Sequence, residues 1–323
     1  CGLEYAGRRG LGGLFPHLSN LRPDYLRMLG EIVRFDRAAR QLLAAGDDGT
    51  TLGTFATTHR FSDYFRTHFL VPMVSAVWSC APRTAMDYPA SYLFTFLHNH
   101  GLLAIRGAPQ WRTVVGGSRT YVERIAKGLH DVQLATPIES VRRGEGHVQL
   151  RTVDGDEATF DATIIATHAD QALRILAAPT ATHRQVLGAF GYSPNVTMLH
   201  TDARLLPRAR RAWASWNYRL PSCSADFTAV RLSYHMNTLQ GFEARHDYVV
   251  SLNSADVIDS DRVVTTMTYE HPVYTEQSVA GQRQLADLSD SVIAFAGAHH
   301  GWGFHEDGCR AGVEAARCLG ALW

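Results

Sequence analysis

A glycine-punctuated loop near the C-terminus holds the side chains best suited to proton transfer. His299 and His300 stand in it, followed by Trp302. A neutral imidazole can take or give a proton near pH 7, so His299 and His300 are the predicted catalytic residues. Hydrogen-bonded loop structure is the alternative interpretation of the same two histidines.

The segments on either side of this loop predict a buried strand and a helix. An apolar run ends at Gly297, and Glu306 and Asp307 lie in the first turn of a predicted helix with a face of small residues. Gly303 and its neighbours leave bare backbone for a flat or anionic ligand, and the amides around Gly308 can stabilise negative charge. The pattern predicts a ligand site, with an ordinary strand–helix connection as the alternative.

Three other segments carry short motifs. They are Gly116-Gly117-Ser118 ahead of a helix predicted over 121–129, Ile138-Glu-Ser-Val141 in a strand, and Asp161-Ala-Thr-Ile-Ile-Ala166 in another strand. With the C-terminal Ala-Gly…Gly segment, their order resembles the flavin-containing amine oxidase and phytoene desaturase superfamily. Within it the chain is most similar to the bacterial predicted NAD/FAD-binding oxidoreductase branch.

The resemblance implies a fold, a cofactor and a set of contacts. The implied fold is mixed α/β (α+β): an FAD-binding nucleotide domain of amine-oxidase type, interleaved with a substrate domain of helices and an antiparallel sheet. The cofactor is FAD. Its implied binding residues are Gly116, Gly117, Ser118, Val141, Ala166, Gly297, Gly303, Asp307 and Gly308. One residue departs from the family pattern, because Ala298 follows Gly297 where the family usually has an acidic residue.

Composition excludes several classes of partner. Lysine plus arginine and aspartate plus glutamate both number 31, so no global field favours nucleic acid, and His98-Asn99-His100 lacks the zinc-framed hairpin of a nuclease. Five scattered cysteines predict reduced thiols in a cytoplasmic protein. The C-terminal histidines have no carboxylate or thiolate at ligand spacing, so no metal is predicted.

No apolar run approaches the roughly 18–20 residues that cross a bilayer. We therefore expect no stable membrane span, while transient membrane contact stays open. The pattern does not fix an oligomeric state.

The start of the chain differs from the resembled family, whose members open with a strand, a G-x-G-x-x-G turn and a helix. This sequence starts at Cys1, and Gly10-Leu-Gly12-Gly13 follows Arg8-Arg9 rather than a buried strand. We predict a loop or hairpin turn there. We also expect that a segment precedes this sequence and that FAD binding is weak without it.

Periodicity predicts the elements that position these residues. One long amphipathic helix is expected over 23–45, and apolar helical segments over 61–80 and 90–103 form either core or the lining of an apolar pocket. Asp154-Gly155 indicates a hairpin, and most of 193–275 is expected to form an antiparallel sheet. Five aromatic residues are candidate pocket walls: Tyr192, Trp216, Tyr218, Tyr234 and Tyr274.

The predicted domains alternate along the chain: substrate domain over 1–108 and 189–288, FAD-binding domain over 109–188 and 289–323. The leading hypothesis is an FAD-dependent oxidoreductase of lipid metabolism acting on an apolar, fatty-acyl or lipid-like small molecule by desaturation or double-bond isomerisation. The alternatives are a flavin amine oxidase of small amines, and a non-catalytic lipid- or protein-binding module on a decayed flavoprotein fold.

Overall fold

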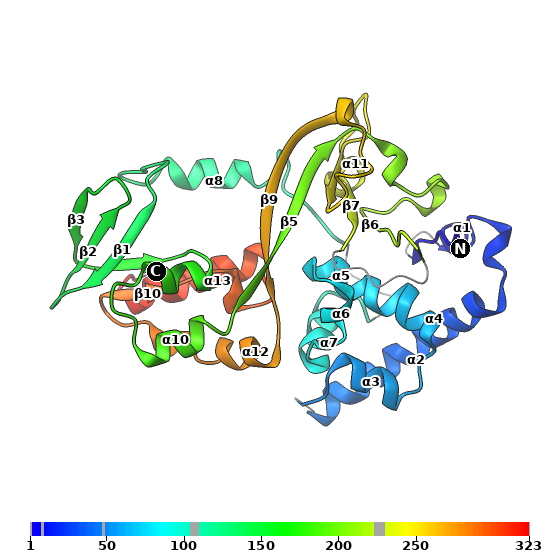
Figure 1. The fold of residues 1–323 in the computed structure, drawn as a ribbon, viewed down its shortest axis with the longest axis horizontal. Coiled ribbons are helices and arrows are strands. Elements are labelled where there is room, and N and C mark those ends of the chain that lie inside the picture. The colour runs from blue at the N-terminus through cyan, green and yellow to red at the C-terminus, as the bar shows by residue number, and fades with distance from the viewer. Residues whose placement is uncertain (1, 8–9, 47–48, 104–109, 223–229, 323) are drawn as a thin grey trace. The chain divides into compact units, whose positions relative to one another are not determined.

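The computed structural model describes residues 2–7, 10–46, 49–103, 110–222 and 230–322. It contains two compact units (Figure 1). Unit 1 comprises Cys1–Arg124 and Ser193–His271, and unit 2 comprises Ile125–Tyr192 and Pro272–Trp323. The predicted boundary after residue 108 and the cysteines Cys1 and Cys223 lie outside the described residues.

Unit 1 begins with the helices that the apolar periodicity predicted. The predicted helix 23–45 is confirmed as α2 (Pro23–Ala45), which has proline in its first turn and ends at Gly46 in the left-handed conformation (φ 69°). The loop or hairpin predicted at 10–13 is wrong. These residues form a short helix, α1 (Gly10–Leu14), whose Gly13 is buried.

The apolar segments 61–80 and 90–103 are largely helical, and their phenylalanines form core. The Phe35 ring of α2 lies 5.4 Å from Phe94 and 5.8 Å from Phe65 between centroids, and it also contacts Phe55. These contacts confirm the core interpretation for those rings. The helices are α3 (Leu52–Thr58), α4 (Asp63–Phe65), the π-helical turn η3 (Arg66–Leu70), α5 (Val71–Trp78), α6 (Pro82–Ala85) and α7 (Ala90–Asn99).

The predicted antiparallel sheet is also confirmed. Five strands lie in the order β6-β7-β8-β5-β9, and their bounds are β5 (Gly191–His200), β6 (Trp216–Tyr218), β7 (Leu232–His235), β8 (Val249–Leu252) and β9 (Val263–Val273). Antiparallel register places Ser233 opposite Ser251. The Ser251 hydroxyl lies 2.7 Å from that of Ser233 and 2.8 Å from His200 Nε2, so one face of the sheet has a buried polar network.

Short helices connect the remaining parts of unit 1. They are η2 (Leu18–Asn20), η4 (Ala203–Leu205), η5 (Arg210–Ala212), α11 (Met236–Gln240) and η6 (Ser260–Arg262). The helix α8 (Arg119–Ala126) spans the division between the units.

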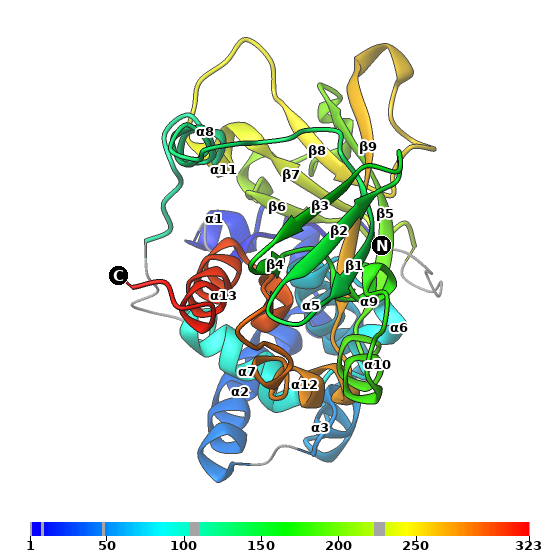
Figure 2. The same cartoon turned by 90° about the vertical axis from the view of Figure 1, so that its left-hand side faces the viewer.

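Unit 2 contains two small sheets. The strands β1 (Ile138–Arg143), β2 (Val148–Thr152) and β3 (Glu157–Phe160) are antiparallel neighbours, and Figure 2 shows them side by side. The Asp154-Gly155 hairpin is confirmed between β2 and β3, with Gly155 at φ 94°. The strands β4 (Thr163–Ile165) and β10 (Ile293–Phe295) are parallel, with Phe295 beside Ile165.

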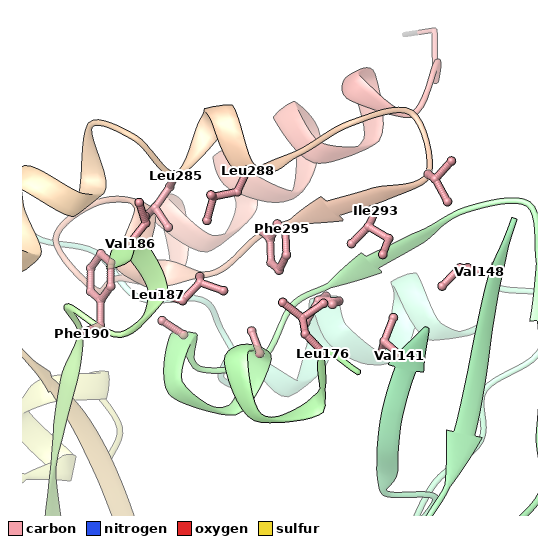
Figure 3. Packing of buried hydrophobic residues seen from close by; sticks show 14 residues of the cluster. Val141, Val148, Leu176, Val186, Leu187, Phe190, Leu285, Leu288, Ile293 and Phe295 are labelled. Carbon is pink, nitrogen blue, oxygen red and sulfur yellow. The ribbon is translucent and has the colours of Figure 1, made fainter. Parts of the chain in front are cut away.

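An apolar core fixes these strands. Ile293 and Phe295 of β10 are buried in one cluster with Leu176, Leu187 and Leu288 (Figure 3). The surrounding helices are α9 (Ala169–Ile175), α10 (Ala181–Leu187), α12 (Glu276–Gln282), η7 (Ala286–Leu288), η8 (Ala298–His300) and α13 (His305–Cys318).

Two further observations concern the cysteines and the helices. Among the described residues, Cys80, Cys309 and Cys318 are free thiols. None of the helices in the described ranges combines the length and apolarity needed to cross a bilayer.

Candidate functional site

The carboxyl ends of β4 and β10 emerge at the same edge because the two strands are parallel, and such edges bind ligands in open α/β sheets. The Ala296 N–H donates to the Ile165 carbonyl at 3.0 Å. Ala166 follows at the end of β4, and a Cβ added to Gly297 would lie 3.6 Å from the Thr167 carbonyl. The structure therefore brings together Ala166 and Gly297, which the sequence placed on separate segments.

Gly297 has a steric reason to be glycine. Its φ is 155°, and an added Cβ would lie 2.6 Å from Nδ1 and Cε1 of His299. The His299 ring therefore folds back over the glycine, in space that no other residue type leaves free.

His299 is buried on every side, with 5% of its surface exposed. Its ring packs against Phe190 edge to face, at 5.3 Å between centroids, and lies 4.9 Å from the ring of His300. Burial, together with the nearby His300 and His168, lowers the pKa of His299 to about 3. His299 is thus neutral at pH 7 and packs as part of the loop.

His300 is less buried and differs in one respect. Its Nε2 atom is buried, and no hydrogen-bond partner for it exists in the described part of the chain. Burial also lowers the pKa of His300 to about 4. A buried polar atom without a partner costs roughly 1–3 kcal/mol, so Nε2 of His300 is suited to a bound ligand. Asp170 Oδ1, at the start of α9, is in the same condition among the described residues.

Two backbone amides directly after Gly297 also have no protein acceptor in the ranges that the structure describes: those of Ala298 and His299. The next two amides are bonded, because His300 N–H donates to Gly297 O and Gly301 N–H donates to Ala298 O, each at 3.1 Å. Adjacent unbonded amides at the end of a strand can bind an anionic or polar oxygen. These amides and His300 Nε2 fit a flavin nucleotide, which presents phosphate, ribityl and ring oxygens.

Asp307 supports the loop rather than offering a free carboxylate. It is 4% exposed. Its Oδ2 accepts the N–H groups of Trp302 and Phe304, each at 3.1 Å, and its Oδ1 accepts from the Arg310 guanidinium at 2.8 Å. A Cβ on Gly301 would lie only 2.1 Å from Oδ1, so the loop packs directly against this carboxylate.

The first turn of α13 holds Glu306 and Asp307, as the sequence predicted. The helix begins at His305, and the Gly308 N–H already donates to the Phe304 carbonyl at 3.1 Å. The amides that an α-helix leaves without intrahelical acceptors are therefore those of 305–307, and the prediction of Gly308 N–H as a donor is wrong. A Cβ on Gly308 would lie 3.8 Å from Ala298 N, an ordinary van der Waals contact, so this turn of α13 lies beside the Ala298 amide.

Gly303 and Val141 have definite surroundings in unit 2. Gly303 is exposed with φ 91°, and its added Cβ would lie 3.0 Å from the Tyr274 hydroxyl. Val141 is buried in β1, and its carbonyl accepts the Ala177 N–H at 2.9 Å. A carbonyl has a second lone pair, so this bond does not preclude a contact with a nucleotide base.

The paired glycines belong to unit 1 and are described on their own. Gly116 and Gly117 both have positive φ, 81° and 79°, and a Cβ on Gly116 would lie 2.8 Å from the Thr120 methyl group. Ser118 immediately precedes α8, and its carbonyl accepts the Val122 N–H at 3.2 Å. The positive φ values favour glycine at both positions of this turn.

Two of the five candidate pocket-wall residues have other roles. Tyr274 is fully buried, and its hydroxyl donates to the Gly301 carbonyl at 3.0 Å. The Tyr192 hydroxyl accepts the Ala169 N–H, and its ring stacks on His168 at 4.2 Å. Sequence reasoning missed a further loop contact, Gln282, because a single glutamine at a helix end carries no signal.

The other three aromatic residues lie together in unit 1. Trp216, Tyr218 and Tyr234 are half-buried and pack, as Ala76 of α5 does, against a buried cluster of Val230, Leu232 and Leu252. Burial raises the pKa of Tyr218 to about 12, and a hydrogen bond to Ser75 opposes that rise. Burial also raises the pKa of Tyr234. Among the described residues, Ser75, Ser79 and Cys80 are the groups that act on the pKa values of these two phenols.

The chain matches a protein-family model described as flavin containing amine oxidoreductase over residues 4–208. No curated protein is significantly similar in sequence.

Solved structures share the fold. A CLA-producing fatty acid isomerase from P. acnes has a TM-score of 0.64 at 12% identity, a putrescine oxidase variant 0.60 at 15%, and cyclohexylamine oxidase from Brevibacterium oxydans 0.57 at 14%. Each match covers 94% of this chain and 77% of the other. At these identities the likeness concerns the fold.

Proposed function

The chain belongs to the family of flavin-containing amine oxidoreductases and is an FAD-dependent oxidoreductase, and from this premise we propose that its substrate is apolar, of the fatty-acyl or lipid-like class. The observation that carries the substrate class is the cluster of aromatic side chains, Trp216, Tyr218 and Tyr234, that packs on an apolar core.

The cofactor would be held by groups of unit 2 that the protein itself leaves unbonded. The amides of Ala298 and His299 would donate to oxygens of the nucleotide. The small residues Ala166 and Gly297 would let the nucleotide approach the protein backbone closely. Gly116, Gly117, Ser118 and Val141 remain proposed contacts through the family pattern. The chemistry that bound FAD supplies is acceptance of a hydride from a carbon–hydrogen bond.

The two predicted catalytic histidines divide into different roles. His299 is packed beneath the loop, so we assign it to positioning. His300 keeps Nε2 for a ligand, and its lowered pKa makes it neutral at pH 7. A neutral imidazole can hydrogen-bond a substrate or cofactor atom and accept a proton transiently, although a group with a pKa of about 4 retains that proton only briefly.

The apolar substrate class follows from what surrounds the phenols. Burying an ammonium group without a compensating charge costs several kcal/mol, so we take a nearby carboxylate as the feature that distinguishes a site for cationic amines from one for neutral chains. The groups that shift the pKa of Tyr218 are burial, Ser75 and Cys80, and those that shift the pKa of Tyr234 are burial and Ser79. No carboxylate is among them, which favours a neutral chain.

We expect unsaturated acyl lipids, mixed anaerobically with the full-length holoprotein, to bleach the flavin absorbance or to yield a shifted double bond. Desaturation leaves the flavin reduced, whereas isomerisation returns the hydride and leaves the visible spectrum oxidised. Product analysis by mass spectrometry separates these two outcomes.

Putrescine and cyclohexylamine form the contrasting arm of the same experiment. Bleaching by these amines with peroxide release in air, and no acyl product, would replace the lipid assignment with amine oxidation. The family assignment would stand.

A further inference from the structure

The loop from 299 to 304 is held by side chains from outside it. Gln282, the last residue of α12, directs its one amide nitrogen at two loop carbonyls: His299 O at 2.8 Å and Gly301 O at 2.5 Å. An amide NH₂ has two hydrogens, so a single side chain satisfies both acceptors. No aliphatic residue of the same size could replace it.

The position of Gln282 is fixed by its own neighbour. A Cβ on Gly281 would lie 3.3 Å from the Val186 carbonyl and 3.5 Å from the Phe190 ring. Glycine therefore lets α12 approach α10 closely. Phe190 in turn packs on His299. The close approach of α12 to Phe190 therefore supports the loop as well.

Two more side chains complete the set. The Tyr274 hydroxyl donates to the Gly301 carbonyl, and the Asp307 carboxylate accepts the Trp302 and Phe304 amides. Tyr274 and Asp307 are 0% and 4% exposed. We call Tyr274, Gln282 and Asp307 the loop clamp.

The loop clamp fixes where the unbonded groups point. It satisfies the carbonyls of His299 and Gly301 and the amides of Trp302 and Phe304. The amides of Ala298 and His299 and the His300 Nε2 atom stay without protein partners in the described ranges. Those three groups are the ones that fit the cofactor. Their direction depends on the loop conformation, because His299 and His300 lie between the clamped Gly301 and Gly297.

We propose that Tyr274, Gln282 and Asp307 are positioning residues that set the affinity and the electronic environment of the flavin through the 297–304 loop. The inference rests on the proposed function, since it assumes that FAD binds at this loop. None of the three residues is required to touch the cofactor. We therefore expect their substitution to change FAD affinity through the loop, without the loss of a direct contact.

The test is Gln282→Met in the full-length protein, with Gln284→Met as the matched control. Met keeps the length of the side chain and removes both donated hydrogen bonds. Gln284 is half-buried, and its side chain donates a solvent-exposed bond of 3.4 Å to Ala280 O within its own segment. We expect the Kd for FAD to rise at least about tenfold in Gln282→Met, with a shifted flavin absorption maximum and midpoint potential in the protein that is loaded.

The far-UV circular dichroism of Gln282→Met should remain that of wild type. The Kd for FAD of the control Gln284→Met should also remain that of wild type. Tyr274→Phe, which removes one hydroxyl, is the second variant and decides the question if Gln282→Met fails to fold. Its control is Tyr269→Phe, because Tyr269 is 50% exposed on β9.

Unchanged Kd and midpoint potential in both clamp variants would overturn the inference while leaving the function intact. A full-length wild-type protein that takes up no FAD would overturn the function and the inference together. A lower melting temperature with unaltered flavin spectrum and potential would reduce the clamp to a folding role and also overturn the inference.

Discussion

Replacing Gly297 by alanine is expected to weaken FAD binding by at least about tenfold, or 1.4 kcal/mol, and to lower the free energy of unfolding by about 1–3 kcal/mol. The added Cβ would lie 2.6 Å from two atoms of the His299 ring. The ring must move, and it is enclosed by Phe190 and His300. Displacing it would turn the adjacent unbonded amides away from the ligand.

Gly312→Ala is the matched control, since it makes the same substitution 15 residues later in α13. An added Cβ on Gly312 would meet nothing within 4 Å, and alanine is favoured over glycine inside a helix by roughly 0.5–1 kcal/mol. The control should therefore be slightly stabilising. Urea unfolding and FAD titration of both variants check the pair. Equal FAD affinities in Gly297→Ala and wild type would contradict the proposal that FAD binds at this loop.

Acidification is expected to destabilise the protein before its carboxylates titrate. The pKa values of His299 and His300 lie at about 3 and about 4 in the folded state, below the 6.5 of an unperturbed histidine. The folded state therefore resists protonation. The stability from the neutral rings is fully present above pH 6.5 and is lost as the pH falls toward the folded values.

The size of this loss follows from linkage. Each histidine contributes a slope approaching 1.4 kcal/mol per pH unit, so unfolding in urea should show a loss of about 2 kcal/mol per histidine between pH 7 and pH 5. His168, from the loop after β4, faces His299 and adds to its shift.

Substitution of His299 and His300 separates their contribution to the pH dependence of stability from that of the rest of the chain. His300→Gln should reduce the slope between pH 7 and pH 5, whereas His147→Gln, at an exposed position, should leave it unchanged. A slope that persists fully in His300→Gln and in a His299→Asn/His300→Gln double variant would assign the pH dependence elsewhere.

Local patterns predicted much of the fold because local physics determined it. The periodicity of 23–45 and Gly46 placed α2 correctly, since an amphipathic face and a left-handed end suffice to define a helix. The Asp154-Gly155 hairpin was predicted correctly for the same reason, since two adjacent turn residues define it. The 10–13 segment failed because glycines that permit a turn also permit a helix when Gly13 is buried by later parts of the chain.

The site was predictable at its glycines and less so at its partners. Gly297 and Gly303 carry a visible signal because only glycine suits their surroundings. Gln282 and Tyr274 contact the loop across 17 to 27 residues of sequence, and no short motif records such a contact. The sequence pattern singled out Asp307 as a cofactor contact, whereas in the structure its carboxylate is bonded to the loop rather than free.

Hydrogen–deuterium exchange with single-amide resolution, on full-length protein with and without FAD, tests the central claim most directly. The account predicts that FAD slows exchange at Ala298 and His299, whose amides have no protein acceptor in the described ranges. The amides of Trp302 and Phe304, already bonded to Asp307, should change little. FAD that binds while the Ala298 and His299 amides exchange as fast as before would contradict the claim.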